Sequence, residues 1–82
     1  MFRILTENKN VEQVKTALVG LGLDYTVYFA EGAWQGQPEN SLMIELDNIP
    51  RQRAEEAAIL IKEMNRQQAV LLQEIPVMSQ FL

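Results

Sequence analysis

Alternating apolar and polar positions predict four short strands in this chain. The pattern is clearest over residues 2–7, and it returns over residues 25–30, 41–47 and 69–75. The second of these segments is rich in aromatic and β-branched residues, which favour strands. Pro76 has no N–H to donate to a neighbouring strand, so the last strand is expected to end before it.

Apolar residues spaced three and four apart predict two helices. The apolar stripe of the first helix consists of Val11, Val14, Leu18 and Leu21. Asn10 is expected to cap its N-terminus, and Gly22 is expected to stop it in a left-handed conformation. The second helix is predicted over residues 50–67, because Pro50 suits the first turn of a helix.

The order of these elements predicts the fold. The chain reads strand, helix, strand, strand, helix, strand, and right-handed crossovers then give a four-stranded antiparallel sheet with both helices on one face. This is the α+β ferredoxin-like βαββαβ sandwich. Residues 1–82 are expected to form a single domain, since no linker or low-complexity stretch interrupts them.

Two helices can cover only one face of such a sheet. The positions expected to face the helices are Ile4, Val27, Phe29, Leu42, Ile44, Leu46, Val70 and Leu72. Alternation then places Leu5, Tyr28, Met43 and Leu71 on the opposite face. Scattered apolar residues are common on protein surfaces, whereas a contiguous patch indicates a contact surface. We favour the second interpretation and expect these residues to form an oligomer interface.

The segment 31–40 is the most unusual part of the chain, since it holds the only tryptophan and two of the four glycines. The candidate ligand-binding or subunit-contact residues are Gly32, Trp34, Gly36, Glu39 and Ser41. One interpretation is a twisted hairpin whose tryptophan packs on a neighbouring element. The other is an arm that reaches a ligand or an adjacent subunit.

Composition narrows the possible chemistry. The 82 residues include 7 Lys and Arg against 11 Asp and Glu, with no histidine or cysteine. Imidazole-dependent catalysis and the usual zinc or iron–sulfur sites are therefore excluded, and we expect no enzyme, catalytic residue, metal or cofactor. The net charge of -4 argues against a nucleic-acid partner. No stretch approaches the ~20 apolar residues of a membrane span, and the absence of cysteine fits a reducing cytoplasm.

The unusual segment resembles a known family. Trp34, Gln35 and Gly36, with Glu39 beyond them, resemble the Trp-x-Gly…Glu hairpin of the CutA-like proteins. Residues 74–77 are similar to the closing segment of that family, and residues 14–22, with Thr26 and Gly32 after them, are similar to the opening of the PII signalling proteins. Both families are ferredoxin-like trimers with clefts between subunits. The resemblance therefore implies a homotrimer, a regulatory or ligand-binding role, and a ligand site at an intersubunit cleft near residues 31–41.

The chain also departs from both families. Residues 33–35 occupy the run in which PII proteins place basic residues and a second glycine for nucleotide phosphates, which argues against ATP binding. A metal would need oxygen ligands such as Glu31, Glu39 or Asp47. The alternative function is a protein-binding adaptor or inhibitor that uses the exposed sheet face without a small-molecule ligand.

Overall fold

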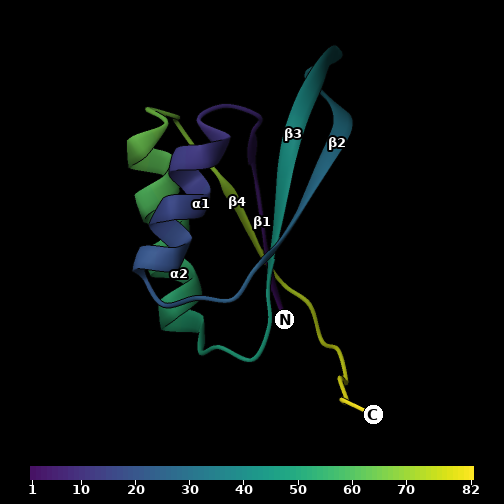
Figure 1. Cartoon of the computed structure of the whole chain (residues 1–82). Helices are drawn as coiled ribbons and strands as arrows, with labels where there is room; N and C mark the ends of the chain where they lie inside the picture. The colour runs from purple at the N-terminus through teal and green to yellow at the C-terminus, as the bar shows by residue number, and fades with distance from the viewer.

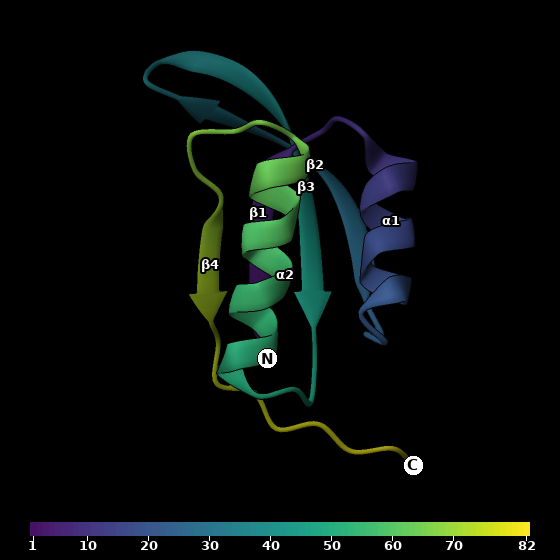
Figure 2. The same cartoon turned by 90° about the vertical axis from the view of Figure 1, so that its left-hand side faces the viewer.

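Four strands and two helices form two layers in the computed structural model, which describes residues 1–82 (Figure 1). The strands are β1 (Phe2–Glu7), β2 (Thr26–Trp34), β3 (Gln37–Leu46) and β4 (Leu71–Glu74). They form one antiparallel sheet in the order β2-β3-β1-β4. The helices, α1 (Val11–Gly20) and α2 (Arg51–Met64), lie side by side on one face of this sheet (Figure 2). The expected α+β architecture, with a four-stranded antiparallel sheet and two helices, is confirmed.

The hydrophobic core lies between the sheet and the helices. Every second residue of β1 is buried, and the last six residues of β3 show the same alternation. The fully buried strand and helix residues are Ile4, Val14, Leu18, Leu42, Ile44, Leu46, Ala54, Ala57 and Ile61. Because the alanines of α2 are small, its backbone can approach the sheet closely. Neither helix is long and apolar enough to cross a membrane.

One residue expected in the core lies outside it. Phe29 is 64% exposed, although its neighbour in the strand register, Leu42, is fully buried. Figure 1 shows the reason, since β2 and β3 lean away from the helices as they extend past the rest of the sheet. Phe29 lies two residues before the extended part of β2, residues 31–34, and the helix layer does not cover it. Val70 and Leu72 are only partly buried against the core.

The strands β2 and β3 are longer than expected because they extend through the segment 31–40. A proline removes one N–H from a strand, so Pro38 would block pairing in a central strand. However, β1 pairs with β3 only as far as the Glu7–Ser41 pair, so Pro38 has a strand neighbour on one side only. The second helix and the last strand are shorter than the predicted ranges 50–67 and 69–75.

A cluster of polar side chains joins the ends of the two helices to β1. The Asn10 Nδ2 donates to Asn65 Oδ1 at 3.0 Å, and Asn65 Nδ2 donates to Gln67 Oε1 at 3.1 Å. Thr6 Oγ1 also donates to Gln67 Oε1. Asn10 is the N-cap residue of α1, as expected, and its backbone is left-handed with φ of 54°. The expected side-chain cap is wrong, since the Asn10 side chain makes no capping hydrogen bond to α1. The tertiary hydrogen bond to Asn65 takes the place of the local one.

The buried position of Ile44 predicts a large loss of stability on truncation. Ile44→Ala should lower the free energy of unfolding by ~2–5 kcal/mol, because it leaves a cavity in the middle of the core. Urea unfolding followed by circular dichroism measures this change. The control Ile59→Ala removes the same atoms from the exposed side of α2 and should change the free energy by less than about 0.5 kcal/mol. Equal losses in the two variants would contradict the assignment of the buried sheet face.

Candidate functional site

The four residues expected at an interface lie in one line across the sheet. Leu5 lies opposite Leu71 of β4 on one side and opposite Met43 of β3 on the other, and Met43 lies opposite Tyr28 of β2. Directly opposite residues have Cβ atoms about 5 Å apart, close enough for their side chains to touch. We call these four residues the outer row. It crosses all four strands on the face that the helices leave uncovered.

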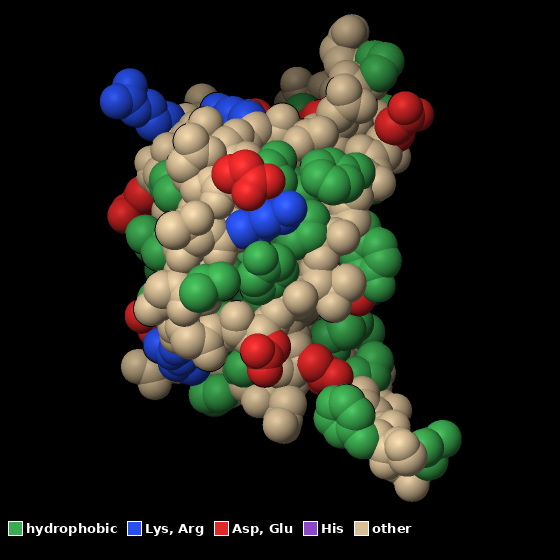
Figure 3. All heavy atoms as spheres, in the orientation of Figure 1, with side chains coloured by type: hydrophobic (Ala, Val, Ile, Leu, Met, Phe, Trp, Pro, Cys, Tyr) green, Lys and Arg blue, Asp and Glu red, His purple; other side chains and the backbone are tan.

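The outer row is open to solvent. Tyr28 is 44% exposed and Leu71 is 53% exposed, while Leu5 and Met43 between them are partly buried. In Figure 3, hydrophobic side chains gather along the right-hand side of the molecule, away from the helices. A contiguous apolar strip of this kind is typical of surfaces that contact another molecule. Its use as an oligomer interface stays a prediction.

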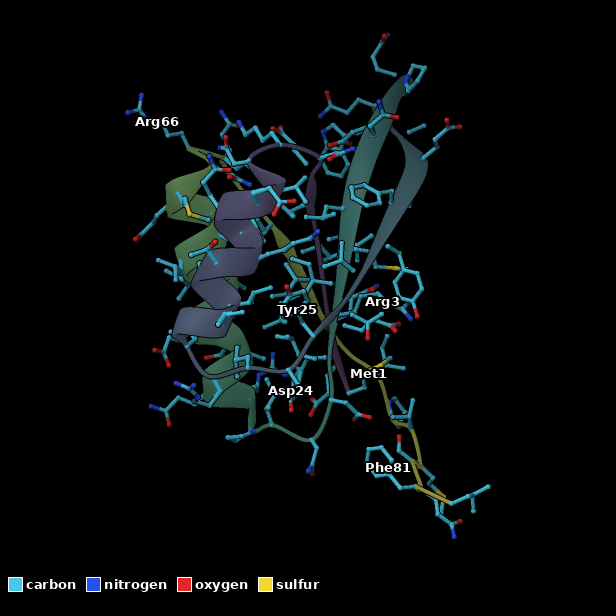
Figure 4. All side chains as sticks on the ribbon, in the orientation of Figure 1. Met1, Arg3, Asp24, Tyr25, Arg66 and Phe81 are labelled. Atoms are coloured by element: carbon cyan, nitrogen blue, oxygen red, sulfur yellow. The ribbon has the colours of Figure 1, made fainter.

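An ion pair borders the outer row. Arg3 Nη2 lies 2.7 Å from Glu45 Oε2, and both side chains are partly buried. Figure 4 shows Arg3 on the side of the sheet away from the helices. Its Nε atom is buried and has no hydrogen-bond partner. This pair is not among the predicted site residues, although Arg3 and Glu45 carry opposite charges on the outward-facing positions of two predicted strands.

Beyond the outer row, β2 and β3 continue as a two-stranded arm. We call residues 31–40 the hairpin arm. Their strand partners lie within the arm, since β1 ends opposite Ser41, and one further backbone bond joins the Asn8 N–H to the Asn40 carbonyl at the base of the arm. Figure 1 shows the arm projecting past the rest of the sheet. The arm at one end and the C-terminal segment at the other make the molecule elongated, with extents of 40 × 24 × 20 Å.

A tight turn closes the hairpin arm. Gln35 has φ of 51° and Gly36 has φ of 79°, and these two residues connect the paired Trp34 and Gln37. Positive φ at both central residues is typical of a type I′ turn, the form that matches the twist of the flanking strands. Glycine adopts this backbone without a steric penalty. Gly32 instead lies in a regular part of β2 opposite Glu39, so only one of the two glycines is required by the backbone.

Four of the five candidate site residues share one face of the sheet. Strand alternation places Gly32, Trp34, Glu39 and Ser41 on the face that continues the outer row, and Gly36 lies in the turn. Trp34 is 69% exposed. This exposure contradicts the interpretation in which the tryptophan packs within its own chain. The hairpin itself, which both interpretations allowed, is present.

The acidic residues of the arm do not form a metal site within one chain. Glu31 lies opposite Asn40, and Glu39 lies opposite Gly32, so the two glutamates are not direct cross-strand partners. No three acidic side chains come close enough to hold a metal ion. A hollow on the arm is lined by Glu31, Gly32, Pro38, Glu39 and Asn40. It is open to solvent, so a ligand there needs a second surface to enclose it.

No protein-family model matches the chain, and no curated protein matches it. The resemblance of the Trp34 hairpin to CutA-like and PII proteins therefore stays a prediction from motif and layout.

The turn geometry predicts that the two glycines of the arm respond differently to substitution. Gly36→Ala places a Cβ on a residue with positive φ and should destabilise the closed arm by about 1 kcal/mol. Amide hydrogen exchange in the arm should accelerate about fivefold. Gly32→Ala is the control, because its backbone is ordinary and no atom lies within 4 Å of the added Cβ. Acceleration of the same size in both variants would contradict the assigned turn.

Proposed function

We propose that this chain forms a small cytoplasmic homo-oligomer of PII/CutA-like type, with a trimer favoured, that binds a ligand or regulates a partner. The observation that carries the proposal is the outer row, an uncovered apolar line that crosses every strand. The proposal includes no catalytic residue, cofactor, nucleic acid or membrane partner. Its fold is the ferredoxin-like sandwich, which is compatible with the strand order β2-β3-β1-β4 and with helices on one face.

Burial of the outer row provides the driving force for assembly. Each Å² of apolar surface removed from water contributes roughly 25 cal/mol. A stable contact buries ~800 Å² per partner. The outer row alone is too small for this area, so the contact must also cover the flanking residues of the sheet. Arg3 and Glu45 already neutralise each other on this face, which lowers the cost of covering their charges.

The hairpin arm is the proposed wall of a ligand site between subunits. Trp34 offers an exposed ring for stacking, while the Glu39 carboxylate and the Ser41 hydroxyl offer hydrogen-bonding oxygens. Residues 31–40 contain two glutamates and no lysine or arginine. The negative charge of the two glutamates repels phosphate groups and favours a neutral or cationic ligand.

A protein-binding adaptor is the second candidate, and the same outer row favours it. Tyrosine and tryptophan are enriched among the residues that dominate protein–protein binding, and Tyr28 and Trp34 share the uncovered face. In this case a different protein, rather than a second copy, covers the sheet.

The oligomer predicts a solution mass above that of one chain. Size-exclusion chromatography with light scattering at micromolar concentration should give a multiple of 9.4 kDa, and three chains for the favoured trimer. Leu71→Ser should shift the mass toward one chain, because it puts a hydroxyl into the buried contact. The control Val19→Ser makes a comparable change on exposed α1 surface and should leave the mass unchanged. A single-chain mass for the unaltered protein would contradict the oligomer.

The ligand site predicts a change in melting temperature with the right compound. A thermal-shift screen with neutral and cationic small molecules and divalent cations should identify at least one compound that raises the Tm, since binding stabilises the native state. Nucleotides and cyclic nucleotides, which carry phosphate, serve as the comparison and should raise it less. Trp34→Ala should abolish that shift and leave the unliganded Tm nearly unchanged, because the ring is largely exposed. Phe29→Ala is the matched control, an exposed aromatic on the other face of β2. A flat screen together with co-purification of one different protein would favour the adaptor.

A further inference from the structure

The outer edge of β2 is an unprotected strand edge. β2 pairs with β3 on one side only, and its nine residues from Thr26 to Trp34 have no strand on the other side. Natural proteins blunt such edges with proline, lysine or a bulge. This strand contains no proline, lysine or arginine, its one charged residue is Glu31 near its end in the hairpin arm, and it pairs with β3 without interruption. It presents free N–H and C=O groups that another extended chain can bind.

The opposite edge of the sheet is protected. β4 has only four residues, and Pro76 follows it closely. Beyond β4, the Ile75 N–H donates to the Met1 carbonyl and the Met1 amino group donates to the Ile75 carbonyl. The two edges therefore differ, and only β2 offers a long pairing surface.

The tail after Pro76 has the properties of a strand without a partner. Residues 77–82, which we call the tail, contain no charged side chain, no glycine and no proline. Met78, Phe81 and Leu82 are fully exposed. Figure 1 shows the tail as an extended segment leaving the end of the sheet, and Figure 4 places Phe81 well away from the helices. Its one side-chain bond within the chain is from Ser79 Oγ to Asp47 Oδ2.

The tail does not line the β2 edge of its own chain. It starts next to β4, and β2 is three strands away, which is about 14 Å at the usual strand spacing. Its Ser79 Oγ instead donates to Asp47 Oδ2, just after the end of β3. The β2 edge is therefore open to the tail of another chain.

We propose that the tail of one copy adds as a strand to the open β2 edge of a second copy. Alternation along the tail sends Phe81 to one face and Met78 and Leu82 to the other. The β2 edge likewise presents Tyr28 on one face and Phe29 on the other, so both faces gain apolar contacts. The added strand extends the outer row beyond Tyr28.

This inference rests on the proposed oligomer and names the segment that joins its copies. The two contacting surfaces are different parts of the chain, so the contact is heterologous, and contacts of this type close into rings when the rotation permits. A pairing of β2 with β2 would instead produce a two-fold dimer.

Disulfide trapping tests the inference, because the chain has no cysteine of its own. Edge variants Tyr28→Cys, Phe29→Cys and Ala30→Cys are each mixed with tail variants Ser79→Cys and Gln80→Cys and then oxidised. At least one edge–tail pair should form an intermolecular disulfide at five or more times the yield of the control pairs, in which Val19→Cys on α1 replaces the edge variant. Yields no higher than the control would overturn the inference. A dominant edge–edge disulfide, or an intramolecular disulfide in a chain carrying both cysteines, would also overturn it.

A second measurement separates this inference from the proposed function. Phe81→Asp places a charge in the tail and should reduce the light-scattering mass to that of one chain, while Val19→Asp should not. If the unaltered protein is oligomeric and Phe81→Asp keeps the same mass, the tail contact is wrong and the oligomer stands. If the unaltered protein has the mass of one chain, the tail contact and the proposed oligomer are both wrong.

Discussion

Two helices cover one face of a four-stranded sheet, and the other features of the molecule depend on that limit. The inward positions of β1 and β3 are buried, with Ile4 and Ile44 fully covered at the centre. The alternate positions carry the outer row, and the chain provides no third layer to cover it. Domains near this length bury only about 60% of the surface of the unfolded chain. The proposed association with another chain would remove the remaining apolar surface from water.

The unequal lengths of the strands create the second feature, the hairpin arm. β1 ends opposite Ser41, so the arm has no helix above it and no third strand beside it. Its stability depends on cross-strand pairs and on a turn that glycine allows at Gly36. The aromatic and carboxylate groups of the arm are therefore presented to solvent instead of being packed. This placement connects the outer row to the proposed ligand site, since both lie on the same face.

The sequence predicted the features that depend on local period, and it missed those that depend on distant contacts. Residues 2–7 alternate between the two faces of the sheet without a break. This alternation predicted both the bounds of β1 and the face on which Leu5 and its neighbours in the outer row lie. Gly32 and Pro38 disfavour strands locally, but pairing on one side only makes them acceptable in the arm. Phe29 has the alternation of a core residue, but it is exposed because the helices do not reach it. The reach of the helices is not contained in any local pattern. Asn10 has the residue type of a cap, yet its partner Asn65 lies 55 positions away.

The most direct test of the central claim is the solvent accessibility of the outer row in solution. Hydroxyl-radical footprinting across a dilution series measures the oxidation rates of Met43 and Tyr28 relative to exposed Ile59 on α2. If another copy covers the sheet, both relative rates should fall severalfold as the protein concentration rises through the micromolar range. Relative rates that stay constant at the values expected for an open face would contradict the account.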